Sequence, residues 1–328
     1  MLRGPAVAFL AGAILALSGC GSGSDTSAVD PSARLVSLPG AMRKIDFDDV
    51  MFSERLGRVL VPARQSGLYL VDPASGKAER VGHLSGADSA DEGEGRLFVL
   101  DREAGTLSVV DADSGDTVAS TELANPGDYV RYAPSRREVW ISEPAASPPG
   151  IEIYTLSGGS TLRRTAFVPV PGGTEGLVVS DATGKAYTHA GSDVVAVDLT
   201  SRRVTARWSS GCRGTHGFPR VDERNRLLMA SCSEDGEVVL LDLRDGRRLG
   251  RYAVGGGEAL PGLSAPGHFE VRADPGRRLA TLAGSRKGLR LVDTVQVPDV
   301  GHCLTGDGAG HYWTCDAERG RILQFSDR

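Results

Sequence analysis

The sequence predicts an all-β fold, a seven-bladed β-propeller. An alternating apolar strand that ends in Asp or another polar residue, followed by a short turn containing Gly or Ser, recurs seven times. The composition agrees with this prediction, because 43 glycines and 17 prolines favour many turns over long helices. The seven copies are Leu68–Asp72, Leu107–Asp111, Ile151–Thr155, Val194–Asp198, Val238–Asp242, Leu289–Asp293 and Ile322–Ser326.

Further strands flank most copies of this repeat. In the second repeat, for example, Arg96–Leu100 precedes the copy and Thr117–Thr121 follows it. Four short strands in about 40–45 residues is the period of one propeller blade. The sixth repeat departs from the pattern, because Gly255–Ala265 forms a long Gly-rich insertion and Val295–Val300 is weak as a fourth strand.

The two ends of the repeat array predict how the ring closes. The last copy is followed only by Asp327 and Arg328, too few residues for a fourth strand, and the first copy has a surplus strand, Ala33–Leu38, ahead of it. Pairing of this N-terminal strand into the last blade would close the ring and remove the two free sheet edges of an open array. We therefore predict a propeller spanning residues 33–328 whose seventh blade combines both ends of the chain.

The first twenty residues predict export and a lipid anchor. Met1–Arg3 is basic, and the apolar run Ala6–Leu17 is too short for a permanent membrane span, so residues 1–19 read as a signal peptide. The motif Leu-Ser-Gly-Cys ending at Cys20 resembles the lipobox of bacterial lipoproteins, which implies a lipidated Cys20 at the start of the mature chain. The alternative is an ordinary secretory signal with an incidental cysteine. Residues 20–32 would then hold the lipidated cysteine and a flexible Gly/Ser tether.

The remaining four cysteines predict two disulfides in an oxidising compartment. If the Gly-rich turn Thr305–Gly310 joins two hairpin strands, the numbers of paired residues sum to about 618, which places Cys303 opposite Cys315. Cys212 and Cys232 flank a second hairpin and form the other pair. Redox-active or metal-binding cysteines are the alternative interpretation.

The blades resemble the YVTN-type propellers of bacterial exported and surface-layer proteins. The phrases LYLVDPASGKAERV, LSVVDADSGDTVAS and VVLLDLRDGRRLGRY carry this resemblance, which covers roughly Arg34–Arg328. The stretch Cys212–Asp242 also looks like a cysteine-bracketed blade of that family. The resemblance implies an architecture but not a specific function, because these propellers serve many tasks. The predicted lipid anchor at Cys20 implies a location at the membrane, on the periplasmic or cell-surface side.

The residues that lead into the first strand of each blade predict the candidate site, because these strands line the central channel. Blade by blade they are Lys44, Asp88, Asp128, Glu175, His216, His268 and His302. His216, His268 and His302 could bind a divalent transition metal, Zn or Cu, at the channel mouth, with Glu175 or Asp128 nearby. The alternative is that these positions are polar because they surround a solvated channel.

Other functional classes find little support in the sequence. It contains no G-x-S-x-G elbow and no Walker loop, and a net charge of −5 gives no reason to expect a nucleic-acid partner. His83, His189 and His311 are expected at surface or edge positions. The predicted function is a lipid-anchored binding or scaffold module for a protein or small ligand. The alternatives are a metal-binding or metal-delivery lipoprotein and a lactonase- or lyase-like propeller enzyme.

Overall fold

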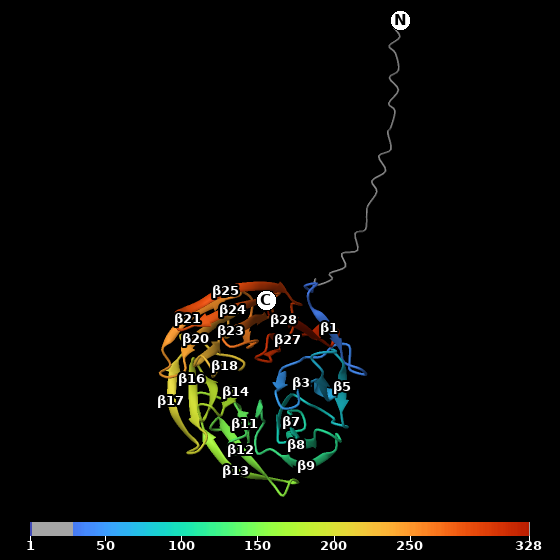
Figure 1. Ribbon diagram of the computed structural model, residues 1–328, viewed down its shortest axis with the longest axis vertical. Helices are drawn as coiled ribbons and strands as arrows, with labels where there is room; N and C mark the ends of the chain where they lie inside the picture. Colours follow the sequence, from blue (N-terminus) through green and yellow to red (C-terminus); the bar gives the residue numbers. More distant parts are fainter. Residues whose placement is uncertain (2–28, 328) are drawn as a thin grey trace.

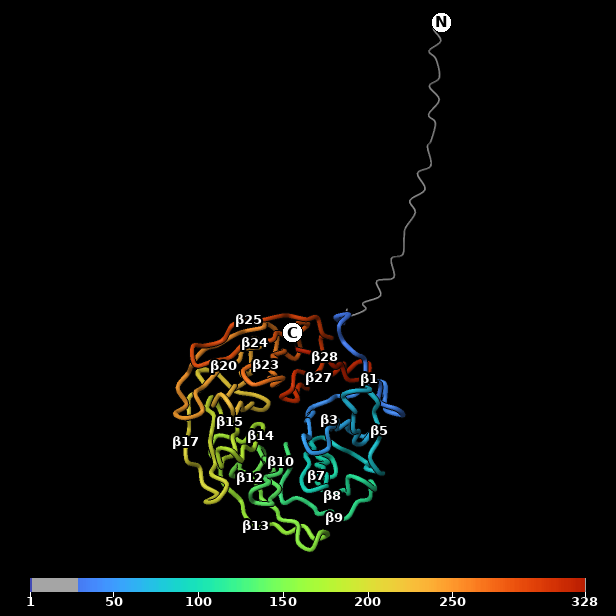
Figure 2. Tube along the Cα trace, in the orientation of Figure 1, coloured from blue at the N-terminus to red at the C-terminus, as the bar shows by residue number. Residues whose placement is uncertain are grey.

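The computed structural model describes residues 29–327 together with Met1. In this part of the chain, strands β1–β28 form seven four-stranded antiparallel sheets, and two short 3₁₀ turns, η1 (Arg64–Ser66) and η2 (Ala317–Arg319), complete the regular structure. The sheets follow one another in a closed ring, as Figures 1 and 2 show. The predicted all-β, seven-bladed propeller is confirmed.

The first four blades each use four consecutive strands, with the first strand innermost. Blade one contains β2 (Met51–Ser53), β3 (Arg58–Pro62), β4 (Leu68–Val71) and β5 (Ala78–Val81). Blade two contains β6 (Ser89–Gly93), β7 (Arg96–Asp101), β8 (Thr106–Asp111) and β9 (Thr117–Glu122). Blade three contains β10 (Val130–Ala133), β11 (Glu138–Glu143), β12 (Gly150–Ser157) and β13 (Thr161–Pro169). Blade four contains β14 (Glu175–Ser180), β15 (Lys185–Ala190), β16 (Asp193–Asp198) and β17 (Arg203–Ser209).

The last three blades complete the ring. Blade five contains β18 (Arg220–Asp222), β19 (Leu227–Ser231), β20 (Glu237–Asp242) and β21 (Arg248–Ala253). Blade six contains β22 (Glu258–Pro261), β23 (His268–Asp274), β24 (Arg278–Ser285) and β25 (Gly288–Gln296). Blade seven contains β26 (Leu304–Gly306), β27 (His311–Asp316), β28 (Arg321–Ser326) and, on its outer edge, β1 (Arg34–Ser37).

The core lies between neighbouring blades. Inner and middle strands are covered on both faces, so β19 is buried at all five positions. The outer strand β21 of the same blade has one face toward solvent and only exposed or half-buried residues. The apolar runs in the middle strands therefore form the packing between sheets, while the outer strands carry charge.

The ring closes as the sequence predicts. Strand β1 pairs antiparallel with β28, with Val36 opposite Ile322, and Val36 is buried in the cluster between blades seven and one. This pairing covers the edge that β28 would otherwise expose. Figure 1 shows β1 beside β28, at the junction of the blue and red ends of the chain.

Blade six differs from the sequence-based prediction. The copy Leu289–Asp293 lies in the fourth strand β25, whereas it was expected to be a third strand, and the third strand is β24. The expected Gly-rich insertion contains the innermost strand β22, which is held by burial of Ala259 and Leu260 against neighbouring strands. A short strand between glycines and a proline carries little local signal, so only its packing defines it.

The four cysteines pair as predicted. Cys303 is joined to Cys315 with Cα atoms 5.8 Å apart, and the neighbouring pair Leu304 and Thr314 has the expected register sum of 618. Cys212 is joined to Cys232 with Cα atoms 5.4 Å apart.

The predicted signal peptide, Cys20 and most of the tether lie outside the described residues. Within the described part, no helix is long and apolar enough to cross a membrane.

Candidate metal site at the channel mouth

One end of the channel, which we call the mouth, brings together four of the seven residues expected there. Asp128, Glu175, His216 and His302 line one pocket of about 310 Å³. The other three do not line this pocket. Lys44 forms an exposed ion pair with Glu318, and Asp88 forms one with Arg64. His268 lies at the other end of its blade. The loops before the inner strands thus converge as the blade alignment predicts, with these three exceptions.

Two histidines and a carboxylate form the tightest cluster at the mouth. His216, Glu258 and His302 each offer a ligand atom, and these atoms all lie within 4.8 Å of one another. His216 Nε2 is 2.9 Å from Glu258 Oε2, and the two imidazole rings are 5.3 Å apart between centroids. Glu258 begins the inner strand of blade six, and His216 and His302 lie in the loops that lead into the inner strands of blades five and seven.

His268 does not belong to this cluster, which corrects the prediction. The pairing of β22 with β23 places Glu258 opposite Asp274 and Pro261 opposite Val271, so His268 lies at the end of β23 away from the mouth. There its Nδ1 contacts the carboxylate of Asp327 at 2.5 Å. His268 was expected at the mouth on the assumption that its strand is the first of blade six, but this strand, β23, is the second. Glu258 occupies the position that was expected for His268.

Asp274 orients His302. Its Oδ2 lies 3.2 Å from Nδ1 of His302, and its Oδ1 accepts a hydrogen bond from the N–H of Gly301. Burial alone would lower the pKa of His302, but the hydrogen bond with Asp274 and the charge of Asp48 raise it above its ordinary value. A carboxylate on one imidazole nitrogen is the usual arrangement behind a metal-binding histidine, because it leaves the lone pair of the other nitrogen free.

Glu175 and His189 support the other histidine. Glu175 Oε1 lies 3.9 Å from His216 Nδ1, and burial raises the pKa of Glu175. His189, which pairs with Glu175 across β14 and β15, donates its Nδ1–H to the carbonyl of Gly217. Burial lowers the pKa of His189 to about 4, so it is a neutral interior residue and not the surface or edge residue that was expected.

Asp128 is bound to Arg102 at the mouth. Its Oδ1 lies 2.6 Å from a guanidinium nitrogen of Arg102, while its Oδ2 is buried without a hydrogen-bond partner. Burial, together with the charges of Asp48 and Glu175, raises the pKa of Asp128 to about 8 against the opposing effect of Arg102. Asp128 is therefore largely protonated at neutral pH, and it is not a member of the cluster of His216, Glu258 and His302.

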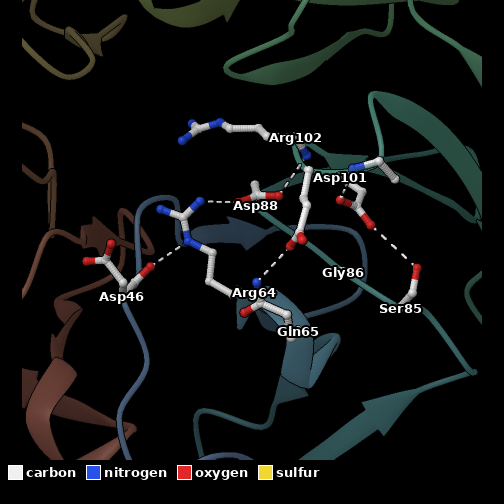
Figure 3. Close-up of a pocket in the computed structure, with 10 residues that line it drawn as sticks. Asp46, Arg64, Gln65, Ser85, Gly86, Asp88, Asp101 and Arg102 are labelled. Carbon is white, nitrogen blue, oxygen red and sulfur yellow. Dashed lines mark hydrogen bonds and ion pairs between the residues drawn. The ribbon is translucent and has the colours of Figure 1, made fainter.

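A larger pocket of about 760 Å³ adjoins the mouth over blades one and two and shares Asp46, Arg64 and Arg102 with it. Figure 3 shows the guanidinium of Arg64 bound to Asp88 and to the backbone of Asp46. Asp101 accepts a hydrogen bond from the backbone N–H of Ala104. Because these charged groups already have partners, they are less available to bind a ligand than the histidines and acids of the mouth.

Three residues of the site were missed from sequence alone. Glu258 follows three glycines and directly precedes the apolar pair Ala259-Leu260, a weak signal for the start of an inner strand. Asp274 ends a second strand, and its partner His302 belongs to the next blade. Asp48, 3.9 Å from His302 Nε2, precedes β2 by three residues and was passed over in favour of Lys44.

Comparison with known proteins supports the fold and leaves the function open. No protein-family model matches the chain, and no curated protein matches it significantly. Among solved structures, the β-propeller domain of Cps50 (Swd1) from Myceliophteria thermophila matches with a TM-score of 0.72 at 13% identity, over 89% of this chain and 100% of that one. A chain of the mitotic checkpoint complex matches with a TM-score of 0.75 at 12% identity, over 99% of both chains. Hydrazine synthase of Kuenenia stuttgartiensis matches with a TM-score of 0.70 at 11% identity, over 88% of this chain and 99% of that one. At identities this low, the structural matches establish a shared β-propeller fold and no shared function.

Proposed function

We propose that the protein is an exported, lipid-anchored β-propeller that binds a divalent transition metal at the channel mouth. The observation that carries this proposal is the convergence of His216, Glu258 and His302 from three consecutive blades. A structural role for the cluster would not require two imidazoles and a carboxylate to face one another. Of the functions considered from sequence, this one uses the specific chemistry of the mouth.

The donor set fits Zn(II) and also suits Cu(II). Two histidines and a glutamate are a known zinc ligand set that leaves a fourth position open to water or another ligand. With bonds of about 2.0–2.2 Å, tetrahedral ligand atoms lie about 3.3 Å apart. The atoms of this cluster are within 4.8 Å of one another, so small side-chain rotations would bring them to bonding distance.

The charge around the cluster favours a cation. Five carboxyl groups and two guanidinium groups line the mouth pocket: Asp46, Asp48, Asp128, Glu175, Asp274, Arg64 and Arg102. The raised pKa of Glu175 and the pKa of about 8 for Asp128 reflect burial of carboxyl groups close to other acids. A divalent cation would offset this excess of negative charge.

Membrane attachment rests on the N-terminal sequence. The lipobox-like residues ending at Cys20 imply a diacyl anchor, and the two disulfides suit the oxidising side of a membrane. The open coordination position at the mouth would let the propeller pass its ion to a partner, which fits metal delivery as well as storage.

Calorimetric titration of the purified protein with Zn(II) and with Cu(II) tests the proposal. We expect one ion per chain, with affinity reduced at least tenfold by His302→Ala and by Glu258→Gln. His268→Ala is the matched control and should bind as the wild type does, because His268 lies at the far end of β23. Absence of stoichiometric binding would refute the proposal, and so would loss of binding in the His268 variant alone.

A further inference from the structure

One half of the Cys212–Cys232 disulfide, Cys232, has backbone contacts with the chain neighbours of two cluster members, His216 and Glu258. Thr215, which precedes His216, forms a β-bridge with Cys232. The carbonyl of Cys232 accepts a hydrogen bond from the N–H of Ala259, which follows Glu258, at 3.0 Å. The backbone of a single cysteine therefore contacts the neighbours of two ligand residues in two different blades.

The loop that carries His216 is held by hydrogen bonds on two sides. On the side of blade four, Thr215 donates both its backbone N–H and its Oγ1–H to the carbonyl of Gly191. On the other side, His216 is bonded to the strand that leads to Cys232. The N–H of His216 donates to the carbonyl of Ser231 at 3.3 Å, and Ser231 Oγ donates to the carbonyl of His216 at 2.6 Å. Ser231 is itself the neighbour of Cys232. The loop contains Gly211 and Gly217 at positive φ, and such a segment gains much conformational freedom when a cross-link is removed. The disulfide closes this loop onto the strand to which His216 is hydrogen-bonded.

The same disulfide can be reached from outside. A pocket of about 280 Å³ is lined by both of its cysteines together with Glu237, whose Oε1 lies 3.6 Å from Cys232 Sγ. The other disulfide differs, because Cys303 and Cys315 are completely buried. A reductant in solution therefore has access to one disulfide and not to the other.

We propose that the Cys212–Cys232 disulfide places the metal site under redox control, an inference that rests on the proposed metal-binding function. A dithiol donor transfers two electrons and two protons to the bond. The S–S bond breaks, each cysteine gains a hydrogen, and the donor becomes a disulfide. Only hydrogen bonds to Ser231 and, through Thr215, to Gly191 then hold His216 in place. Its position relative to Glu258 and His302 is less fixed, and the affinity for the ion falls. Cys212 and Cys232 act as positioning residues and do not bind the ion themselves.

The test compares zinc affinity of the purified protein before and after reduction with a phosphine. The phosphine takes up the oxygen of water and leaves two thiols, which are capped with iodoacetamide so that they cannot bind zinc. Peptide mass mapping should find the caps on Cys212 and Cys232 while Cys303–Cys315 stays closed. We expect reduction to raise the Kd for zinc at least tenfold, the usual effect of losing a residue that orients a metal ligand.

A Cys212→Ser/Cys232→Ser variant provides the second measurement. It should show the same weakened Kd with or without phosphine, and circular dichroism should show an intact β-fold. Uncapped, reduced wild-type protein should regain its original Kd on reoxidation, which separates loss of positioning from unfolding.

A Kd that stays within twofold after reduction would overturn this inference and leave the proposed function standing. If the oxidised protein binds no metal, the proposed function and this inference fall together.

Discussion

Replacing Asp274 with asparagine removes one charge from the mouth while nearly preserving side-chain size. In the wild type, Oδ1 accepts from the N–H of Gly301 and Oδ2 accepts from Nδ1–H of His302, so Nε2 keeps a free lone pair. In the variant, the amide oxygen of Asn keeps the hydrogen bond from the N–H of Gly301. The amide NH₂ group then faces Nδ1 of His302. Nδ1 then becomes the acceptor, the proton moves to Nε2, and the nitrogen that faces the mouth can no longer bind metal.

The expected loss is 10- to 100-fold in zinc affinity, as is typical when the partner of a ligand histidine is removed. This corresponds to about 1.4–2.7 kcal/mol of binding free energy. Competition against a chromophoric chelator measures it directly, and circular dichroism checks that the fold is intact. An unchanged Kd in a folded Asp274→Asn protein would refute the orienting role of this carboxylate.

The pH dependence provides a second readout of the same contact. Burial would lower the pKa of His302, but its hydrogen bond with Asp274 and the charge of Asp48 raise it above the ordinary value of 6.5. Only the neutral imidazole binds metal, so wild-type affinity should fall as the pH drops through this raised pKa, by up to tenfold per pH unit. The Asp274→Asn variant lacks one of the raising contributions, so its decline should begin at a lower pH. Superimposable profiles would contradict this reasoning.

Three further predictions concern the fold and the anchor. Val36→Ala should lower the free energy of unfolding by about 2 kcal/mol, from two buried carbons and the cavity they leave, whereas Leu35→Ala on the exposed side of the same strand should cost under about 1 kcal/mol. Equal losses in urea unfolding would contradict the closure of the ring by β1. Asp49→Ala should cost about 3–5 kcal/mol, because it leaves the fully buried guanidinium of Arg131 without its carboxylate partner. A loss below about 1 kcal/mol in the same unfolding experiment would show that the Asp49–Arg131 pair contributes little to the stability of the fold. Cys20→Ser should move the protein from the detergent phase to the aqueous phase in a partition experiment, and a wild-type protein already in the aqueous phase would contradict lipidation.

The fold was predictable because its signals are local and repeated. The strand patterns around Leu107–Asp111 and Val238–Asp242 each predict a blade with no knowledge of the others. Ring closure followed from a strand missing at one end and an extra one at the other. The Cys303–Cys315 pairing followed from hairpin register, which depends only on the position of one turn.

The site was predicted only in part because its members meet across blades. His216 and His302 were identified from their places in the repeat. Glu258 was missed because β22 is defined by packing against β23 and not by its own sequence. Asp274 was missed because it orients a histidine of the following blade, and such a contact leaves no periodic signal in the chain. The error at His268 has the same origin as the omission of Glu258.

The layer beneath the mouth explains why a cation would stop at the histidines. One step further along the inner strands, Arg131 is bound by Asp49, while Arg220 is fully buried and donates to the carbonyls of Pro261 and Leu304 without a carboxylate partner. Burial lowers the pKa of Arg220 to about 9, with a further contribution from Arg131, so the guanidinium is still charged at neutral pH. Asp49 and Asp91 oppose the charge of Arg131, whereas Arg220 has no carboxylate partner and repels a cation that moves inward. Acidic groups at the mouth and the guanidinium of Arg220 below it would together hold a metal ion where it can be reached from one face of the propeller.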